Sequence, residues 1–438
     1  MADATTPDMH RLKPSLTLPM AFCLSLKQVI GGGVIVLTGT AIGLAGAGAA
    51  PAYLLACIVV LLVSLPYAVL GAARPMSGSL YRWPSRFIGA PAGFIAFWMV
   101  LSTHVGLAAY AVTFGTTLHM LVPVVSARLG GLAALGSVLA LNLLGTGVSA
   151  RAGIVITAAV VLSLLWLAVA GAPHVEPARL ADLLPHGWHG LLSAAALLTF
   201  PISGATLVSE LSGEMRRPGR DIPVAILGAT VCAALLYVCV TLVAAGVPSP
   251  GAGGRSLTAV AASVMRPLPL VLFELGAGIV SMLGIMNAHM LWGSRSILMA
   301  AQDGWLPHAF GKTTAKGVPA WPLLLLGAIG AVPLMAGLDV ASIIRVSGLG
   351  ASISAILSIA CAPLNARADP AAYRASPLAL PIGMLLLASV LAVASQGVTI
   401  ALLLRDLNLR LILWWGLWLT IGGAIIAMRL KHVRIVDD

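Results

Sequence analysis

Apolar stretches long enough to cross a lipid bilayer recur along almost the whole of this sequence. A transmembrane helix needs about 20 apolar residues. Of the 438 residues, 59% are hydrophobic and only 9% are charged, whereas soluble domains carry about 25% charged residues. The pattern predicts an all-α polytopic membrane protein with twelve transmembrane helices, at 18–47, 52–72, 92–122, 129–149, 152–172, 189–212, 222–247, 269–301, 319–337, 340–362, 377–403 and 411–429.

The charged residues set the expected orientation of these helices. With the N-terminus inside the cell, most Lys and Arg residues fall in cytoplasmic loops, as the positive-inside rule requires. We therefore expect both tails, 1–17 and 430–438, to be cytoplasmic. The same bias explains the net charge of +11 without a nucleic-acid partner. The composition, rich in Arg and Ala and poor in Lys, is typical of a GC-rich bacterium and points to its inner membrane.

Three consecutive glycines, Gly31, Gly32 and Gly33, interrupt the first apolar segment. Each costs about 1 kcal/mol of helix propensity relative to alanine, so the run predicts a break. Unwound backbone within a membrane must be buried in protein or line a wet cavity. The helix that starts after the break would point its free N–H groups and positive dipole end into that cavity, where a carboxylate could bind. The alternative is close helix packing, which small residues also permit.

A second interruption is predicted in the sixth apolar segment, at Pro201, Ser203 and Gly204. Proline removes a backbone donor, and the glycine weakens the helix that follows. Matching breaks in the first and sixth helices, near the bilayer midplane, indicate a transporter with a five-plus-five inverted repeat (a LeuT-like fold) and its site at the repeat interface. We predict a first repeat at 18–172, a second repeat at 189–362 and two appended helices at 377–429.

Three motifs resemble the amino acid–polyamine–organocation (APC) superfamily of permeases. Ile30 to Ile35 is similar to the glycine pattern of that superfamily's first helix. Phe200 to Pro223 (FPISGATLVSELSGEMRRPGRDIP) resembles the sixth-helix signature and the loop after it. Ser294 to Pro307 (SRSILMAAQDGWLP) resembles the end of the eighth helix and its Asp-Gly-x-Leu-Pro turn. The resemblance implies alternating access and a substrate that is an amino acid or a related amine.

The resemblance also implies which backbone groups meet the substrate. The first break would take the carboxylate on N–H groups, the sixth-helix break would take the ammonium on exposed carbonyls, and Phe200 would be an aromatic gate. Many relatives place an aromatic or acidic residue where this chain has Ile202 and Ser203, which leaves the substrate open. The expected substrate-binding residues at the breaks are Ile30, Gly31, Gly32, Gly33, Phe200, Ile202, Ser203 and Gly204.

Lys27 and Glu210 are ionisable residues within apolar segments, where charge is costly and often functional. In sodium-coupled relatives of this fold, the position of Lys27 lends a backbone carbonyl to a sodium site. We expect the Lys27 ammonium to occupy that region, making transport sodium-independent, and it could also release and take up a proton. The alternative is that Lys27 snorkels to the interface. Glu210 is expected either to pair with Lys27 or an arginine, or to couple protons.

Two histidines and a loop complete the candidates. By resemblance, His104 in the third helix falls where relatives contact substrate, and His289 in the eighth falls where they place an aromatic residue that faces the pore. Both are expected at the substrate site; the alternative is that each histidine only satisfies a carbonyl of a neighbouring helix. Glu214 belongs to a loop read either as an inner-gate latch or as a solvated loop. Asn287 is either a substrate contact or a link between helices.

The favoured function is secondary active transport of an amino acid or close derivative, sodium-independent, by exchange or proton coupling. An amine or polyamine permease would need acidic residues at the breaks, and the sequence has none there. A divalent-metal transporter would need an Asp and Asn at the first break and a Met at the sixth. The five cysteines lack metal-ligand spacing, and no nucleophile–base pair or phosphate loop is present, so no enzyme, metal or cofactor is expected.

A membrane sensor without transport would need a soluble output domain, for which the tails are too short. The oligomeric state is left open.

Overall fold

The computed structural model describes residues 15–248, 256–405 and 407–435. Within them the chain is helical, and strand-like pairing is confined to one isolated parallel bridge between Leu16 and Met215. In chain order the elements are α1 (Leu18–Val29), α2 (Gly32–Ala45), η1 (Gly46–Gly48), α3 (Ala49–Ala73), α4 (Ser79–Phe87), α5 (Ala90–Thr103), α6 (Gly106–Leu121), α7 (Ala127–Leu143), α8 (Thr146–Gly171), η2 (Ala172–His174), α9 (Pro177–Leu180), α10 (Gly187–Ile202), η3 (Ala205–Glu214), α11 (Pro218–Gly246), α12 (Leu257–Val264), α13 (Pro267–Phe273), η4 (Glu274–Val280), α14 (Ser281–Gln302), η5 (His308–Gly311), α15 (Ala320–Met335), α16 (Val340–Ala368), α17 (Pro370–Arg374), α18 (Ile382–Arg405), α19 (Leu409–Arg429) and η6 (Leu430–His432).

Eight helical stretches of the described chain are long and apolar enough to cross a membrane, and α1, α7 and α15 are shorter apolar helices. Helix is present in each of the twelve stretches that the sequence predicts to be apolar helices. Local chemistry explains several starts: the side chains of Ser126, Asp339 and Asn408 accept hydrogen bonds from the first turns of α7, α16 and α19, which satisfies N–H groups that have no partner within the helix.

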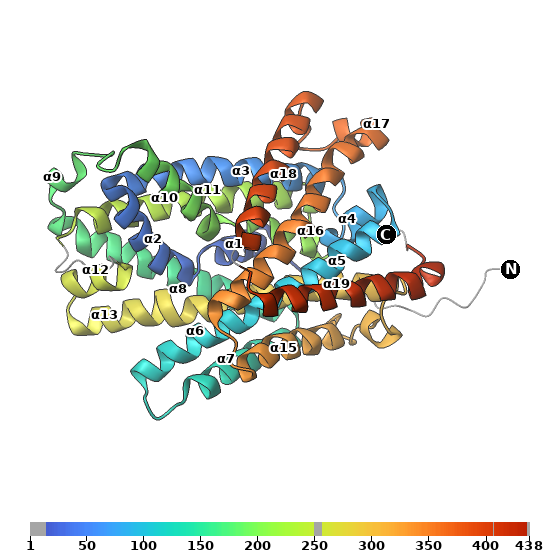
Figure 1. The fold of residues 1–438 in the computed structure, drawn as a ribbon, viewed down its shortest axis with the longest axis horizontal. Helices are drawn as coiled ribbons and strands as arrows, with labels where there is room; N and C mark the ends of the chain where they lie inside the picture. Colours follow the sequence, from blue (N-terminus) through green and yellow to red (C-terminus); the bar gives the residue numbers. More distant parts are fainter. Residues whose placement is uncertain (1–14, 249–255, 406, 436–438) are drawn as a thin grey trace.

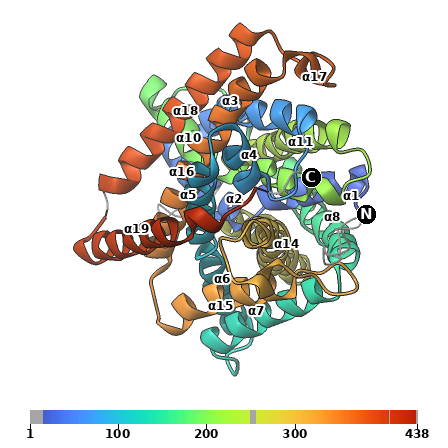
Figure 2. The same ribbon diagram turned by 90° about the vertical axis from the view of Figure 1, so that its right-hand side faces the viewer.

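The helices form two packed groups with α14 between them. On one side α1, α2, α3, α10 and α11 pack together, and on the other α5, α6, α7, α15 and α16 pack together. Both views place α3, α10 and α11 on the opposite side of the molecule from α6, α7 and α15 (Figures 1 and 2). α14 contacts α1 of the first group, α6 and α7 of the second, and also η3.

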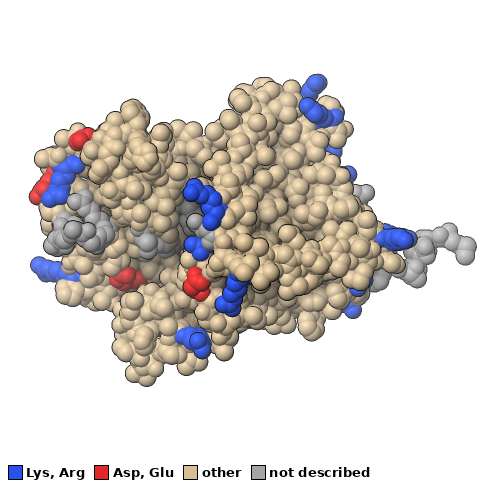
Figure 3. Space-filling model, viewed as in Figure 1, with Lys and Arg blue, Asp and Glu red and all other residues tan. Residues whose placement is uncertain are grey.

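The surface has the charge distribution of a membrane protein. Uncharged side chains cover most of the face in view, and the charged ones lie in small separate groups at its two ends and near its centre (Figure 3). The apolar spans and this surface together describe a multi-pass membrane protein.

Three apolar segments are interrupted. The breaks predicted at the glycine run and at Ser203–Gly204 are present, as gaps between α1 and α2 and between α10 and η3. A third break was not predicted: the segment expected as one helix over 92–122 is two helices, α5 and α6, separated at His104 and Val105. The eighth segment also contains a stretch of π-helix, η4.

Candidate functional site

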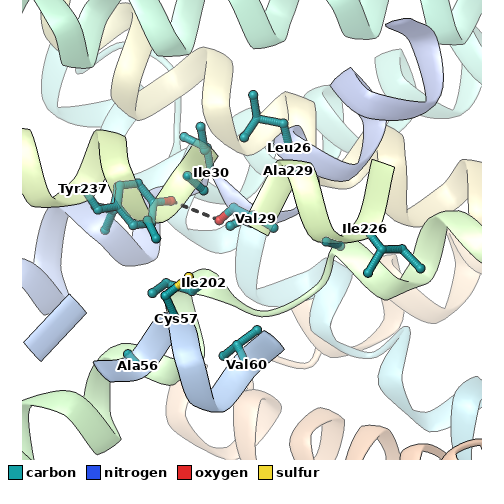
Figure 4. Close-up of a cluster of buried hydrophobic side chains, with 14 of the residues drawn as sticks. Leu26, Val29, Ile30, Ala56, Cys57, Val60, Ile202, Ile226, Ala229 and Tyr237 are labelled. Atoms are coloured by element: carbon teal, nitrogen blue, oxygen red, sulfur yellow. Dashed lines mark hydrogen bonds between the residues drawn. The ribbon is translucent and has the colours of Figure 1, made fainter. Parts of the chain in front are cut away.

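The first interruption exposes a helix N-terminus to the interior. α1 ends at Val29, Gly31 is extended with φ −139° and ψ −174°, and α2 begins at Gly32. The freed carbonyl of Val29 accepts a hydrogen bond from the Tyr237 hydroxyl of α11 at 3.2 Å (Figure 4). A Cβ on Gly31 would lie 1.9 Å from Cδ1 of Ile285, so α14 packs closely against this glycine, and a larger residue here would have to displace the end of the Ile285 side chain. The first N–H groups of α2 have no partner within the helix, which suits an anion.

The second interruption touches the first. Gly204 has φ +115°, a conformation that other residues rarely adopt. A Cβ on Gly204 would lie 3.2 Å from the carbonyl oxygen of Gln28, and the Ser25 hydroxyl donates to the carbonyl of Ala205 at 3.4 Å. The structure therefore brings the two breaks, far apart in sequence, into direct contact.

The side chains at the breaks differ in their surroundings. Ile30 and Ile202 are buried among apolar side chains (Figure 4). Ser203 is exposed, and its hydroxyl donates to the carbonyl of Thr199 at 2.6 Å. Gly32 and Phe200 lie in helices, but the surroundings of Gly32 and the side chain of Phe200, the expected gate, lie outside what the structure describes.

A small cavity lies beside the two breaks, between α1, η3 and α14. Its volume is about 10 Å³, which is about what one water molecule needs. An amino acid does not fit, so the molecule is closed at this point. The lining residues are Leu24, Gln28, Leu207, Val208, Leu211, Ala288 and Trp292.

Lys27 does not snorkel: its side chain is buried in the interior. Lys27 is 1% exposed, and its Nζ has no hydrogen-bond partner within the described residues. Two glycines make room for it. A Cβ on Gly153 of α8 would lie 3.1 Å from Nζ, and a Cβ on Gly284 of α14 would lie 3.0 Å from Cδ. The ammonium thus sits where α1, α8 and α14 meet, one turn before the first break.

Glu210 is not paired with Lys27 or with an arginine in the described part of the chain, contrary to that expectation. It is fully buried, and its carboxylate accepts from the backbone N–H of Leu80 at 2.5 Å and from the hydroxyls of Ser79 and Ser296 at 3.0 and 2.6 Å. Leu80 lies in the first turn of α4, so the helix dipole also favours the anion. Hydrogen bonds from α4 and α14, instead of a cation, hold this carboxylate.

Glu214 and Arg295 form a buried ion pair one turn further along. The Arg295 Nε donates to Glu214 Oε1 at 2.7 Å, and both side chains are at most 2% exposed. The guanidinium also donates to Thr146 Oγ1 at the start of α8 at 2.7 Å. The carbonyl of Glu214 accepts the N–H groups of Ser15 and Leu16 at 2.9 and 2.8 Å. Glu214 is therefore buried and ion-paired, which rules out the solvated-loop alternative for this residue.

His104 and His289 lie side by side. Their ring centroids are 5.0 Å apart in an edge-on arrangement, and each ring lies within 5 Å of Trp292, at 4.9 and 4.7 Å. His104 is brought there by the unpredicted break between α5 and α6. Gly293 leaves room for its ring, because a Cβ there would lie 2.1 Å from His104 Cε1.

The sequence model of the family described as amino acid permease matches residues 21–408. The chain belongs to the amino acid permease family. This confirms the resemblance to the APC superfamily, and with it the expectation of a transporter instead of an enzyme.

Three proteins that are similar to the permease are named as transporters. It is 28% identical to the branched-chain amino acid permease of Bacillus subtilis, with 94% of each chain covered. It is 25% identical to the branched-chain amino acid permease of Lactococcus lactis, over 72% of this chain and 74% of that one. It is also 26% identical to the methylthioribose transporter of Bacillus subtilis, over 66% and 67%.

Asn287 of the permease links helices. Its Oδ1 accepts from Asn142 Nδ2 at 2.8 Å and from the Ser149 hydroxyl at 2.7 Å, and its Nδ2 donates to the carbonyl of Ser149 at 3.2 Å. These bonds join α7, α8 and α14. Of the two expectations for Asn287, the link between helices is the one that its contacts support.

Sequence reasoning missed Gln28 and Trp292, which line the cavity, and the pairing of Arg295 with Glu214. A polar residue one turn before a predicted break was a usable signal for Gln28. The partners of Glu210 were not predictable, because Ser79 and Ser296 lie 131 and 86 residues away.

Proposed function

We propose that this permease is a sodium-independent secondary transporter of an amino acid, working by alternating access with exchange or proton coupling. The proposal includes the LeuT-like arrangement of twelve membrane helices, with repeats at 18–172 and 189–362 and two appended helices at 377–429. It places the protein in a bacterial inner membrane with both tails, 1–17 and 430–438, in the cytoplasm. The observation that carries it is the direct contact between the two interrupted helices.

The contact offers both halves of an amino acid a partner. The N-terminus of α2 at Gly31–Gly33 receives the carboxylate. The free carbonyls at the C-terminal end of α10 and in the break after it, at Phe200, Ile202, Ser203 and Gly204, receive the ammonium. Helix dipoles and free backbone groups favour these charges. Phe200 is proposed as the gate. No acidic side chain lies at either break, which supports an amino acid over an amine or polyamine.

Lys27 supports sodium independence. Its buried ammonium, without a hydrogen-bond partner in the described structure, lies between α1, α8 and α14. A second cation placed near it would meet charge repulsion undamped by bulk water. Glu210, held by neutral donors, is the second candidate for coupling, because its carboxylate can bind a proton without breaking an ion pair.

The test is ligand stabilisation of the purified permease followed by reconstitution. Amino acids, their decarboxylated amines and their keto acids are screened by thermal unfolding, in sodium and in choline. A ligand at 100 times its Kd stabilises by about 2.7 kcal/mol. We expect stabilisation by amino acids, none by the matching amines, and no effect of sodium.

Counterflow of the stabilising amino acid in proteoliposomes then measures transport. Stabilisation by amines alone would overturn the substrate class, and an absolute requirement for sodium would overturn the role of Lys27. Binding without counterflow would favour a sensor.

A further inference from the structure

A compact group of aromatic nitrogen atoms lies next to the proposed substrate site. His104 from the α5–α6 break and His289 and Trp292 from α14 form a triangle with ring centroids 4.7 to 5.0 Å apart. All three side chains are more than nine-tenths buried. We call His104, His289 and Trp292 the ring cluster.

The ring cluster has unmet hydrogen-bonding capacity. Both ring nitrogens of His104, both of His289 and Nε1 of Trp292 have no partner among the described residues. A buried polar atom without a partner costs about 1–3 kcal/mol, and native proteins rarely leave such atoms together. Five such nitrogen atoms lie together here. A neutral imidazole has one nitrogen that donates and one that accepts, so the ring cluster suits a ligand group that both donates and accepts hydrogen bonds.

The ring cluster is continuous with the two breaks. Trp292 and Gln28 both line the cavity between α1, η3 and α14. Oε1 of Gln28 is also buried without a partner in the described chain, and Gln28 packs against Gly204 at the second break. Polar atoms therefore extend from the break at Gly204 through Gln28 and Trp292 to the histidine pair.

We propose that Gln28 and the ring cluster form the compartment for the substrate side chain, and that it selects amino acids whose side chains carry a hydrogen-bonding hydroxyl or amide over purely aliphatic ones. The inference rests on the proposed function, because it needs the amino acid backbone to be held at the two breaks. The side chain then enters the space beside Trp292 when the closed cavity widens. His104, His289, Trp292 and Gln28 are specificity residues in this arrangement.

Pairs of amino acids with similar shape and different polarity test whether the compartment selects polar side chains. Thr and Val differ by a hydroxyl against a methyl, and Asn and Leu differ by an amide against an isopropyl group. Binding of each to the purified, full-length permease is measured by isothermal titration. We expect Thr to bind about tenfold or more tightly than Val, and Asn likewise more tightly than Leu, because aliphatic partners leave the nitrogens unpaired.

Two matched pairs of variants locate the effect. H289L removes the ring nitrogens, so the Thr-to-Val ratio of affinities should approach one, whereas H289Q keeps a donor and an acceptor and should keep most of the ratio. H104L and H104Q repeat the comparison at the second ring. Thermal unfolding of each variant checks that it is folded.

The outcomes separate the two proposals. If Val and Leu bind as tightly as Thr and Asn to the unmodified permease, the polar compartment is wrong while the proposed function stands. If the ratio is large but neither H289L nor H104L changes it, the ring cluster is not its source and the inference fails. If no amino acid binds, the proposed function fails and this inference falls with it.

Discussion

Nε of Arg295 lies 2.7 Å from Oε1 of Glu214, and this buried ion pair ties the end of η3 to α14. Removing one partner of such a pair strands a charge and costs about 3–5 kcal/mol. E214Q and R295Q should each lower the stability of the permease by about that amount. The double variant should lose less than the sum, and unfolding of all four proteins in detergent measures this coupling.

The exposed pair between Glu176 and Arg179 is the control. It has the same 2.7 Å separation, but its side chains are 55% (Glu176) and 38% (Arg179) exposed. E176Q should change stability by no more than about 1 kcal/mol. Equal effects at the two pairs would show that burial of Glu214 and Arg295 contributes nothing.

We expect Lys27 to be needed for transport and, at the same time, to lower the stability of the folded permease. K27M fills the same space without a buried charge, so we expect a gain of about 1 kcal/mol or more in stability together with a loss of transport. In K27A/G153K, a lysine would enter the same space from α8, and transport should partly return. The readouts are thermal unfolding and counterflow; wild-type transport by K27M would show that the ammonium is dispensable.

Substitution of Glu210 should affect proton-driven accumulation but not exchange. E210Q keeps an oxygen that accepts from the N–H of Leu80 and the hydroxyl of Ser79, and the hydroxyl of Ser296 can turn to accept from the new amide NH2. We expect counterflow in liposomes to persist and accumulation driven by a proton gradient to be lost. Accumulation that survives in E210Q would assign Glu210 to structure alone.

The backbone at Gly204 should tolerate only glycine. G204A forces a side chain to φ +115° and against Gln28, and should cost at least about 1 kcal/mol. G43A is the control, because a Cβ at Gly43 in α2 meets nothing within 4 Å and alanine favours helix. The difference in unfolding midpoint between the two variants measures the strain; equal midpoints would contradict it.

Asp339 should make a pH-dependent contribution to stability. Hydrogen bonding to the Ser342 side chain, and then to the Ser342 backbone N–H at 2.8 Å, lowers the pKa of the exposed Asp339 carboxyl below its usual value. A lowered pKa stabilises the fold above the unfolded value of about 3.9 and loses that effect as the pH falls. D339A should therefore lose about 1 kcal/mol near neutral pH and less near pH 3, while D339N keeps the cap throughout. A deficit for D339A that does not shrink on acidification would contradict the ionic contribution.

The sequence predicted those parts of the structure that local chemistry determines. The run Gly31–Gly33 and the Ser203–Gly204 step identified two interruptions, because they weaken a helix wherever it packs. The break at His104 was missed, since no proline or glycine lies in the ten residues before it, 94–103, and only Gly106 follows closely. The hydrogen-bond partners of Glu210 depend on which helices pack around it. Ser79 and Ser296 could therefore not be identified as its partners from the residues next to them in the sequence.

The two glycines around Lys27 also carry a consequence for how this family diverges. Gly153 and Gly284 lack side chains because the lysine fills the volume between α8 and α14. A lineage that replaced Lys27 with a small residue would release both positions from that restriction. Alignments of close relatives should therefore show the three sites changing together, with larger residues at 153 or 284 wherever residue 27 is small.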